Sequence, residues 1–483
     1  MGLLGILLGL VVLIGLSFRG WSVLILAPLA ALVAAFASGE PLLANWTQTF
    51  MGAAGGFLAS FFPLFLLGAI FGKLMDDSGS VNTIAEFMTK KLGTKRAILA
   101  VVLAGAMVTY GGVSLFVAFF VIVPMAQGLF RAADIPNRIA PAAVALGTST
   151  FTMSAMPGTP AVQNAIPMPF FGTTPFAAPG LGIIASVIMF AFGTWWLLRA
   201  EKVARARGEG YGVSTADIEL AVDDPVVRER ATTSGTFDPA EIKNGGDSPQ
   251  APSLLVASLP LTVVVLVNLL MSMVVLPRMD TSFLAEPQWG GISLAAVSGL
   301  WSVIIALIAA ILTLVALNRS RLPGVRETVD AGANASVLPI VSVASLVGFG
   351  AVVASLPAFV SVADWVLSID GGPLVSLAVS TNVLSALTGS ASGGMTIALE
   401  ALGPVYLQIA AIQGIDPALL HRIAVIGSGT LDSLPHNGAV ITLLALCGCT
   451  HRQSYLDIVM CCVVGALLAL VAVIVLGGMF GSF

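Results

Sequence analysis

Long runs of apolar, uncharged residues recur along the whole chain, and they constrain its fold more than any other feature. About 20 such residues cross the hydrocarbon core of a bilayer as one helix. Charged residues make up only 10% of the chain, whereas soluble domains carry about 25%. The sequence therefore predicts an all-α polytopic membrane protein. Eight runs are expected to span the membrane: residues 2–17, 21–37, 51–72, 179–198, 254–276, 291–317, 337–356 and 454–478.

Four further apolar stretches do not fit simple spanning helices. Residues 97–130 form an uncharged run of 34 residues, and residues 371–409 are longer still, with Glu400 as their single charge. We expect each of these two stretches to form a re-entrant hairpin that enters and leaves on the same side. Residues 139–171 and 423–448 are interrupted by Ser, Thr, Pro and Gly, and we expect two discontinuous helices there. The prediction is about ten transmembrane helices together with the two hairpins.

The distribution of positive charge supports this arrangement. If both hairpins return to the side that they enter from, 19 of the 21 Lys and Arg residues fall on one face, and only Arg278 and Arg422 lie opposite. The positive-inside rule makes the crowded face cytoplasmic. We therefore expect both termini outside. Residues 199–253, which are polar and mixed in charge, are expected to form a cytoplasmic linker.

An internal repeat relates the two parts of the chain, and such repeats decide how a fold is read. The segment IPNRIAPAAVALGTSTFTMSAMPGTPAV (135–162) aligns with IDPALLHRIAVIGSGTLDSLPHNGAV (415–440). Upstream, VTYGGVS (108–114) aligns with LTGSASGG (387–394) at nearly the same offset.

The repeat divides the chain into two halves, residues 1–198 and residues 254–483. Each half is expected to hold six elements: three helices, a hairpin, an interrupted helix and a final helix. In each half, five elements cross the membrane once and the hairpin returns to the side that it enters from, so the number of crossings is odd. The second half is therefore predicted to run upside down relative to the first. Inverted repeats are typical of secondary transporters, whose substrate site lies at the bilayer midplane between the repeats.

Polar clusters at membrane depth are the candidate substrate site. Helix breaks expose backbone groups that lipid cannot satisfy, so they line a cavity or meet protein. Opened helix N-termini suit a carboxylate, whereas freed carbonyls and hydroxyls suit Na⁺ or substrate hydroxyls. The alternative is that small polar residues only let helices pack closely. The candidate substrate ligands are Tyr110, Gly111, Gly112, Ser114, Thr148, Ser149, Thr150, Thr152, Thr159, Thr388, Gly389, Ser390, Ser392, Gly393, Ser428, Thr430 and Asn437.

Charged residues near these clusters suggest the coupling ion. Asp432 and His436 lie in the second break, where a carboxyl group at membrane depth costs about 2.5–3.5 kcal/mol and needs a partner. Both side chains suit proton coupling, although a polar pair that holds the break together is the alternative. Glu400 is either a third coupling residue or an interfacial one. No Lys or Arg lies within the clusters, which favours a small, singly charged hydroxy acid over a tricarboxylate.

Other classes of function have little support. Neither an enzyme active site nor a cofactor motif is recognisable, and no basic stripe suggests nucleic acid. Cys447, Cys449 and His451 are a weak candidate for a metal site. We expect these residues to pack as ordinary small side chains and to bind no metal.

Three segments resemble the gluconate permease (GntP) family of the ion transporter superfamily. They are GKLMDDSGSVNTIAEFMTKKLGTKRAILAVVLAGAMV, ADIPNRIAPAAVALGTSTFTMSAMPGTPA and GIDPALLHRIAVIGSGTLDSLPHNGAV. The resemblance implies a bacterial inner-membrane proton symporter for gluconate or related hydroxy acids, including 3-hydroxybutyrate and D-serine. It also implies two re-entrant hairpins, an elevator movement and a homodimer. By position, the resemblance places the first site segments at 110–114 and 148–159, and the second at 388–394 and 428–437.

The chain also departs from the family pattern. Gluconate permeases carry an acidic residue in the first hairpin, where this chain has TYGGVS, and Ser-His-Val-Asn-Asp-Pro in the second break, where this chain has Leu-Pro-His-Asn-Gly. These departures are compatible with a smaller acid such as 3-hydroxybutyrate. The sequence therefore predicts proton symport of a small hydroxy-monocarboxylate. The alternative is a Na⁺-coupled di- or tricarboxylate transporter on the same fold.

Overall fold

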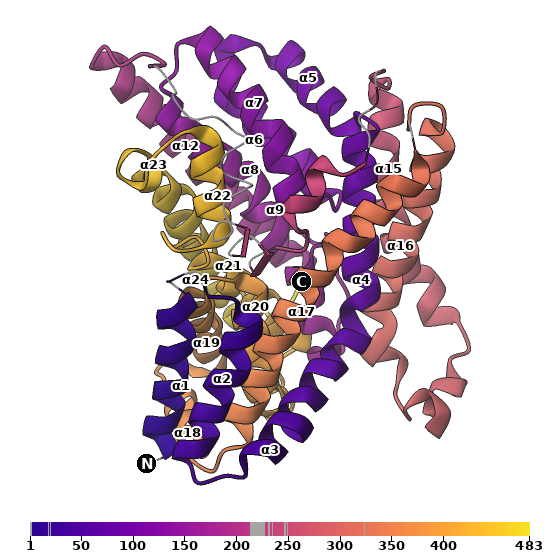
Figure 1. The fold of residues 1–483 in the computed structure, drawn as a ribbon, viewed down its shortest axis with the longest axis vertical. Helices are drawn as coiled ribbons and strands as arrows, with labels where there is room; N and C mark the ends of the chain where they lie inside the picture. The colour runs from indigo at the N-terminus through magenta and orange to yellow at the C-terminus, as the bar shows by residue number, and fades with distance from the viewer. Residues whose placement is uncertain are drawn as a thin grey trace.

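The regular secondary structure of the described residues is entirely helical (Figure 1). This confirms the predicted all-α class. The computed structural model describes residues 2–17, 19, 21–212, 228–229, 232–233, 235–245, 248, 250–322 and 324–483.

The first half of the chain begins with paired helices and ends with one long helix. Its α-helices are α1 (Gly2–Ser17), α2 (Val23–Ala37), α3 (Leu42–Ala44), α4 (Met51–Asp77), α5 (Ser80–Leu92), α6 (Ala97–Tyr110), α7 (Leu115–Ala133), α8 (Ala140–Thr148), α9 (Phe151–Ser154), α10 (Val162–Ala165), α11 (Pro167–Phe171) and α12 (Pro179–Ala206). A π-helical segment, η1 (Asn45–Phe50), joins α3 to α4 in one continuous span.

The second half has a similar order of elements. Its α-helices are α15 (Leu254–Leu270), α16 (Leu294–Asn318), α17 (Val325–Ser355), α18 (Phe359–Leu367), α19 (Gly372–Thr388), α20 (Ala391–Gln413), α21 (Pro417–Thr430), α22 (Gly438–Cys447), α23 (His451–Ile458) and α24 (Gly465–Phe480). A short 3₁₀ helix, η4 (Pro239–Lys243), lies in the linker between the halves. Seven more short helical segments occur in the described residues: η2 (Thr94–Arg96), η3 (Asn137–Ile139), η5 (Met271–Val275), η6 (Leu276–Arg278), η7 (Ser282–Ala285), η8 (Pro287–Trp289) and η9 (Val459–Val464).

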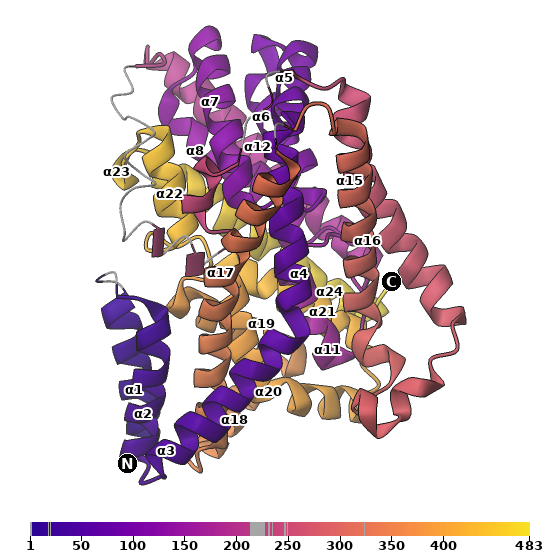
Figure 2. The ribbon, with the colours of Figure 1, turned by 45° about the vertical axis from the view of Figure 1, so that its right-hand side comes forward.

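Within the described ranges, eight helices are long and apolar enough to cross a membrane, or nine if the bent pair α5–α6 counts as one span. Six of them coincide with predicted spans from residue 51 onwards, and two are α7 and α20, the second arms of the predicted hairpins. The predicted spans 2–17 and 21–37 are helices of only 16 and 15 residues. They lie side by side at the N-terminal end of the molecule (Figures 1 and 2).

Both predicted hairpins are pairs of packed helices joined by a tight turn. The first pair turns at residues 111–114, and the second pair turns at Gly389 and Ser390. The stretch 139–171 is broken into α8 to α11, and the stretch 423–448 is broken between α21 and α22. The membrane position of the hairpins stays a prediction, as does the division into inverted repeats. The short helices α5 and α18, each placed before a hairpin, lie at opposite ends of the molecule (Figure 1).

The long helices α4 and α17 pack against each other through the middle of the protein (Figure 2). They approach closely at Gly332 of α17, where an added Cβ would lie 2.7 Å from the Cα of Ile70 and 3.2 Å from the carbonyl oxygen of Ala69. Small residues at such crossings let helix backbones approach closely in membranes. The absence of a side chain at residue 332 therefore sets the distance between these two helices.

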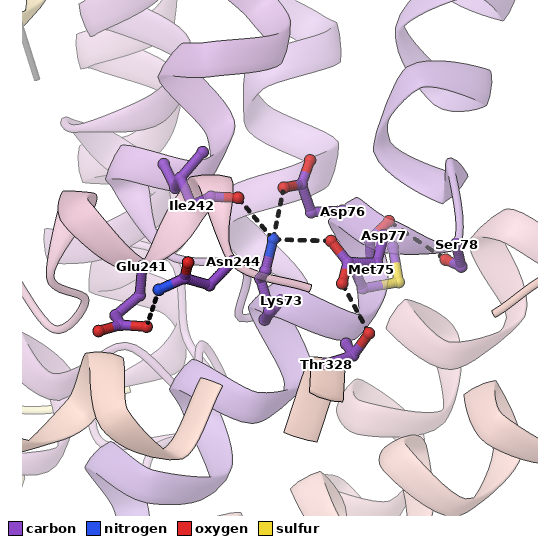
Figure 3. A network of polar contacts seen from close by, with 9 residues as sticks. All are labelled: Lys73, Met75, Asp76, Asp77, Ser78, Glu241, Ile242, Asn244 and Thr328. Atoms are coloured by element: carbon purple, nitrogen blue, oxygen red, sulfur yellow. Dashed lines mark hydrogen bonds and ion pairs between the residues drawn. The ribbon is translucent and has the colours of Figure 1, made fainter. Parts of the chain in front are cut away.

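A buried polar network joins α4, α17 and the linker (Figure 3). Lys73 Nζ donates to Asp77 Oδ1 at 2.7 Å and to the carbonyl oxygen of Ile242 at 2.7 Å. Thr328 Oγ1 of α17 donates to the other Asp77 oxygen at 2.6 Å, and the backbone N–H of Ser248 donates to the Asp77 carbonyl. Because Lys73 is 1% exposed and Asp77 is 0% exposed, this network fixes the linker to the two central helices.

The Gly332 contact predicts a clear stability difference between two glycine variants. Gly332→Ala should lower the free energy of unfolding by about 1–3 kcal/mol, because the packed backbone of α4 has to move. Gly68→Ala on α4 is the matched control, since nothing lies within 4 Å of its added Cβ. It should be neutral or slightly stabilising. Denaturant unfolding of the detergent-solubilised protein measures both, and equal effects would contradict this account of the crossing.

The Lys73 network predicts a second difference. Lys73→Met removes the cation from a fully buried carboxyl group, which typically costs about 3–5 kcal/mol of stability. Lys90→Met also removes one side of an ion pair, with Glu86, but these side chains are 78% and 63% exposed. Its effect should stay within about 1 kcal/mol. Thermal melting of the two variants checks the difference, and a Lys73→Met protein as stable as the native chain would refute it.

Candidate functional site

The first helix break is held by side chains from other helices. Tyr110, at the end of α6, donates from its hydroxyl to the Pro157 carbonyl oxygen at 2.9 Å. Asn268 of α15 donates from its amide to the next carbonyl, that of Gly158, at 3.0 Å. These are backbone groups that the broken helix has freed. They are thus satisfied inside the protein, as the bilayer requires.

Arg422 of α21, a buried positive charge, also donates to backbone carbonyls in and beside the first break. It is 0% exposed, and its guanidinium donates to the Ala155 carbonyl at 3.1 Å and to the Ala177 carbonyl at 2.6 and 3.1 Å. Asn164 lies beside it, accepts a long hydrogen bond of 3.4 Å from Arg422 and donates to the Thr159 carbonyl at 3.0 Å. The first break is therefore fastened to α21, which belongs to the second half.

Asn437 organises the second break. Its amide nitrogen donates to Asp432 Oδ1 at 2.7 Å and to the Gly389 carbonyl oxygen at 2.8 Å. Its amide oxygen accepts from the backbone N–H groups of Ala439 and Val440, and so caps the N-terminus of α22. One buried side chain thus joins the candidate acid, the tip of the second hairpin and a helix end.

Side chains of helix α23 also form hydrogen bonds with the second break. Tyr455 donates from its hydroxyl to the Ser433 carbonyl at 3.1 Å. His451 Nε2 lies 2.8 Å from the Pro435 carbonyl, which can only accept, so Nε2 carries the proton. The carbonyls freed at residues 433 and 435 therefore also have partners.

A cavity lies between the two breaks, and we call it the central cavity. It is bounded by the first residue of α7, Leu115, the first residue of α20, Ala391, and the second residue of α22, Ala439. The ends of three helices thus meet there, and helix N-termini carry partial positive charge. The polar side chains that line the central cavity are Ser149, Ser154, Gln163, Asp432, Ser433 and Asn437.

Asp432 is the only charged residue among those lining the central cavity in the described part of the chain. Its carboxyl group interacts with the backbone N–H of Ala391, at the start of α20, as well as with Asn437. A carboxylate at a helix N-terminus is favourably placed. The side chain therefore occupies a position that would also suit the carboxylate of a small ligand.

His436 faces a different, lateral cavity. This cavity is lined by the predicted site residues Thr388, Gly389 and His436, and by Glu229 and Thr233 of the linker. His436 Nε2 lies 2.9 Å from the Ala386 carbonyl oxygen. Asp432 and His436 therefore line separate cavities.

The linker contacts the residues around this lateral cavity. Ser390, at the tip of the second hairpin, donates from its hydroxyl to the Thr233 carbonyl at 3.0 Å. Glu229 accepts from the backbone N–H of Val23, at the start of α2, at 3.1 Å. The linker contains the short helix η4, and residues 213–227 of the linker lie outside the described residues.

The remaining predicted ligands do not line the central cavity. Hydroxyl groups in helices commonly bond to the carbonyl three or four residues earlier, and five do so here: Thr148, Thr150, Thr152, Ser428 and Thr430. The others pack within the hairpin tips, within the first break or further along α20: Gly111, Gly112, Ser114, Thr159, Ser392, Gly393 and Glu400.

Three polar lining residues were not among the predicted ligands: Ser154, Gln163 and Ser433. Ser154 and Ser433 lie inside the predicted breaks. Gln163 follows the first break in the segment PAVQNA. Its polar amide in an apolar stretch beside a break is the sequence signal that could have identified it as a cavity residue. Sequence reasoning therefore located the breaks better than the side chains that face the cavity.

The fold is similar to that of a solved membrane transporter. MtrF of Neisseria gonorrhoeae, described as illuminating a class of antimetabolite efflux pumps, matches with a TM-score of 0.55 at 12% identity. The match covers 90% of this chain and 85% of that chain. At such low identity the likeness concerns the fold alone.

Sequence comparison gives the family. The family model described as GntP family permease matches residues 1–191. YxjC, an uncharacterized transporter of Bacillus subtilis (strain 168), is 40% identical over 466 residues, which cover 95% of each chain. The high-affinity gluconate transporter of Escherichia coli (strain K12) is 30% identical over 162 residues, 33% of this chain and 35% of that one. On this likeness along nearly its whole length, the chain belongs to the GntP permease family and is a multi-pass membrane transporter.

Proposed function

We propose that this permease imports a small hydroxy-monocarboxylate, of the gluconate or 3-hydroxybutyrate type, by proton symport. The observation that carries the proposal is the position of Asp432, which lies in the second break and lines the central cavity with its carboxyl group near Ala391, the first residue of α20. Membership of a permease family and the partial identity to a gluconate transporter support the substrate class.

The central cavity suits one carboxylate. The helices α7, α20 and α22, which begin at its wall, have 19, 23 and 10 residues. Their N-termini supply backbone N–H groups and partial positive charge. Among the described lining residues there is no Lys or Arg to offset a second or third negative charge. A singly charged acid therefore fits this wall better than a citrate-like tricarboxylate.

Asp432 provides the coupling to protons. A substrate carboxylate and an ionised Asp432 in the same cavity repel each other, and the repulsion is strong where water is scarce. A proton on Asp432 removes that repulsion and frees the start of α20 for the substrate. Substrate and proton therefore bind together and leave together, which is symport. His436 and Glu400 have less support in this role because they do not line the central cavity.

The movement that exposes the cavity to each side is also part of the proposal. The two hairpins and the two broken helices pack on one another around the cavity. We propose that they move together as an elevator against the remaining helices, in a homodimer in the bacterial inner membrane. Both termini are placed outside and the linker in the cytoplasm.

Asp432→Asn tests the coupling role, because asparagine resembles the protonated acid and cannot release a proton. In proteoliposomes, an inward proton gradient should drive the native protein to accumulate labelled 3-hydroxybutyrate. The variant should lose this accumulation at least tenfold and still exchange external for internal substrate. Asp364→Asn, on the exposed face of α18, is the matched control and should accumulate normally.

Two outcomes would contradict the proposal. Accumulation driven only by an equal Na⁺ gradient would transfer the coupling to Na⁺, as in the alternative function. Full proton-driven accumulation by Asp432→Asn would remove Asp432 from the coupling step.

A further inference from the structure

Gln163 stands out among the polar side chains of the central cavity. It lies on α10, directly after the first break, and its side chain is 7% exposed. Its amide oxygen is buried and has no hydrogen-bond partner in the described structure. Buried polar groups are nearly always hydrogen-bonded, so each exception calls for an explanation.

The neighbouring residue Asn164 differs from Gln163, because both the nitrogen and the oxygen of its side-chain amide have partners within the protein. Its nitrogen donates to the carbonyls of Thr159 and Pro175, both at 3.0 Å. Its oxygen lies 3.2 Å from His421 Nε2 and 3.4 Å from an Arg422 nitrogen. Asn164 therefore holds the break together, whereas the adjacent Gln163 lines the central cavity with an amide oxygen that has no hydrogen-bond partner in the described structure.

The Gln163 amide oxygen is an acceptor, so only a group that carries a hydrogen to donate can form a hydrogen bond with it. An ionised carboxylate has no hydrogen to donate, so it cannot satisfy the Gln163 oxygen. A hydroxyl group can donate to that oxygen. Apolar side chains such as Met153 and Leu443 also line the cavity and suit the carbon chain of a small acid. The hydroxyl of a ligand whose carboxylate is held elsewhere in the same cavity therefore suits this oxygen as a partner.

We propose that Gln163 is a specificity-determining residue that binds the substrate's hydroxyl group and so selects hydroxy acids over the corresponding plain acids. This inference rests on the proposed function and deepens it. A site whose buried polar group is completed by a substrate hydroxyl rejects the analogue that lacks it, because the group is then left unpaired.

The test compares two four-carbon acids that differ only in a hydroxyl. Uptake of labelled 3-hydroxybutyrate into proteoliposomes is competed with unlabelled 3-hydroxybutyrate or butyrate. The native protein should prefer the hydroxy acid at least tenfold. Gln163→Leu should weaken the apparent affinity for 3-hydroxybutyrate about tenfold, leave that for butyrate unchanged or tighter, and so abolish most of the preference.

A matched variant separates this effect from the loss of any amide. Gln127 of α7 donates to the Cys447 carbonyl at 3.1 Å and does not line the central cavity. Gln127→Leu should keep the native preference. The melting temperature of the substrate-free protein is the second measurement. Gln163→Leu should leave it unchanged or raise it, since an unpaired buried amide is replaced by an apolar group of similar size.

Three results would overturn the inference. The first is an unchanged preference in Gln163→Leu while the native protein transports the hydroxy acid, which leaves the proposed function standing. The second is an equal loss of both acids with a lower melting temperature, which makes Gln163 a structural residue. The third is an absence of uptake by the native protein under either a proton or a Na⁺ gradient, which overturns the proposed function as well.

Discussion

A helix that breaks inside a bilayer frees backbone N–H and C=O groups, and lipid offers them no partners. In this permease the partners come from distant parts of the chain. Tyr110, Asn268 and Arg422 bond to carbonyls in or beside the first break, and Asn437 joins the second break to a hairpin tip. Because Arg422 belongs to the second half and bonds to the first break, the first break has its full set of partners only when both halves are packed together. The cavity between the breaks is thus a product of the whole fold.

Much of the architecture could be predicted from the positions of uncharged runs. The hairpin pairs, the broken helices and the long helices from residue 51 onwards lie where the sequence predicted them. The N-terminal helices were predicted correctly as helices, yet at 16 and 15 residues they are short for a span. Hydropathy reports which residues avoid water, but it does not report how far a helix extends across the membrane.

The site was harder to predict than the fold. Asp432, Asn437 and Ser149 were expected and do line the central cavity. Many expected hydroxyls instead bond to their own helix, because a Thr four residues after a carbonyl reaches it without any help from the tertiary fold. Arg422 was assigned to the outer face from charge counting, and it is fully buried. Its role depends on the carbonyls of Ala155 and Ala177, which only the folded structure brings near.

The single acid of the central cavity, with no base among its described lining residues, also decides how the membrane voltage acts on the proposed cycle. The loaded cavity holds a protonated Asp432 and one substrate anion, so it carries one negative charge. The empty cavity holds an ionised Asp432 and carries the same charge. The loaded and the empty cavity cross the membrane in opposite directions with the same charge. A voltage of 100 mV therefore changes the free energy of each crossing by about 2.3 kcal/mol, with opposite sign for the two crossings. Transport is then electroneutral, and each pH unit across the membrane supports about a tenfold accumulation of substrate.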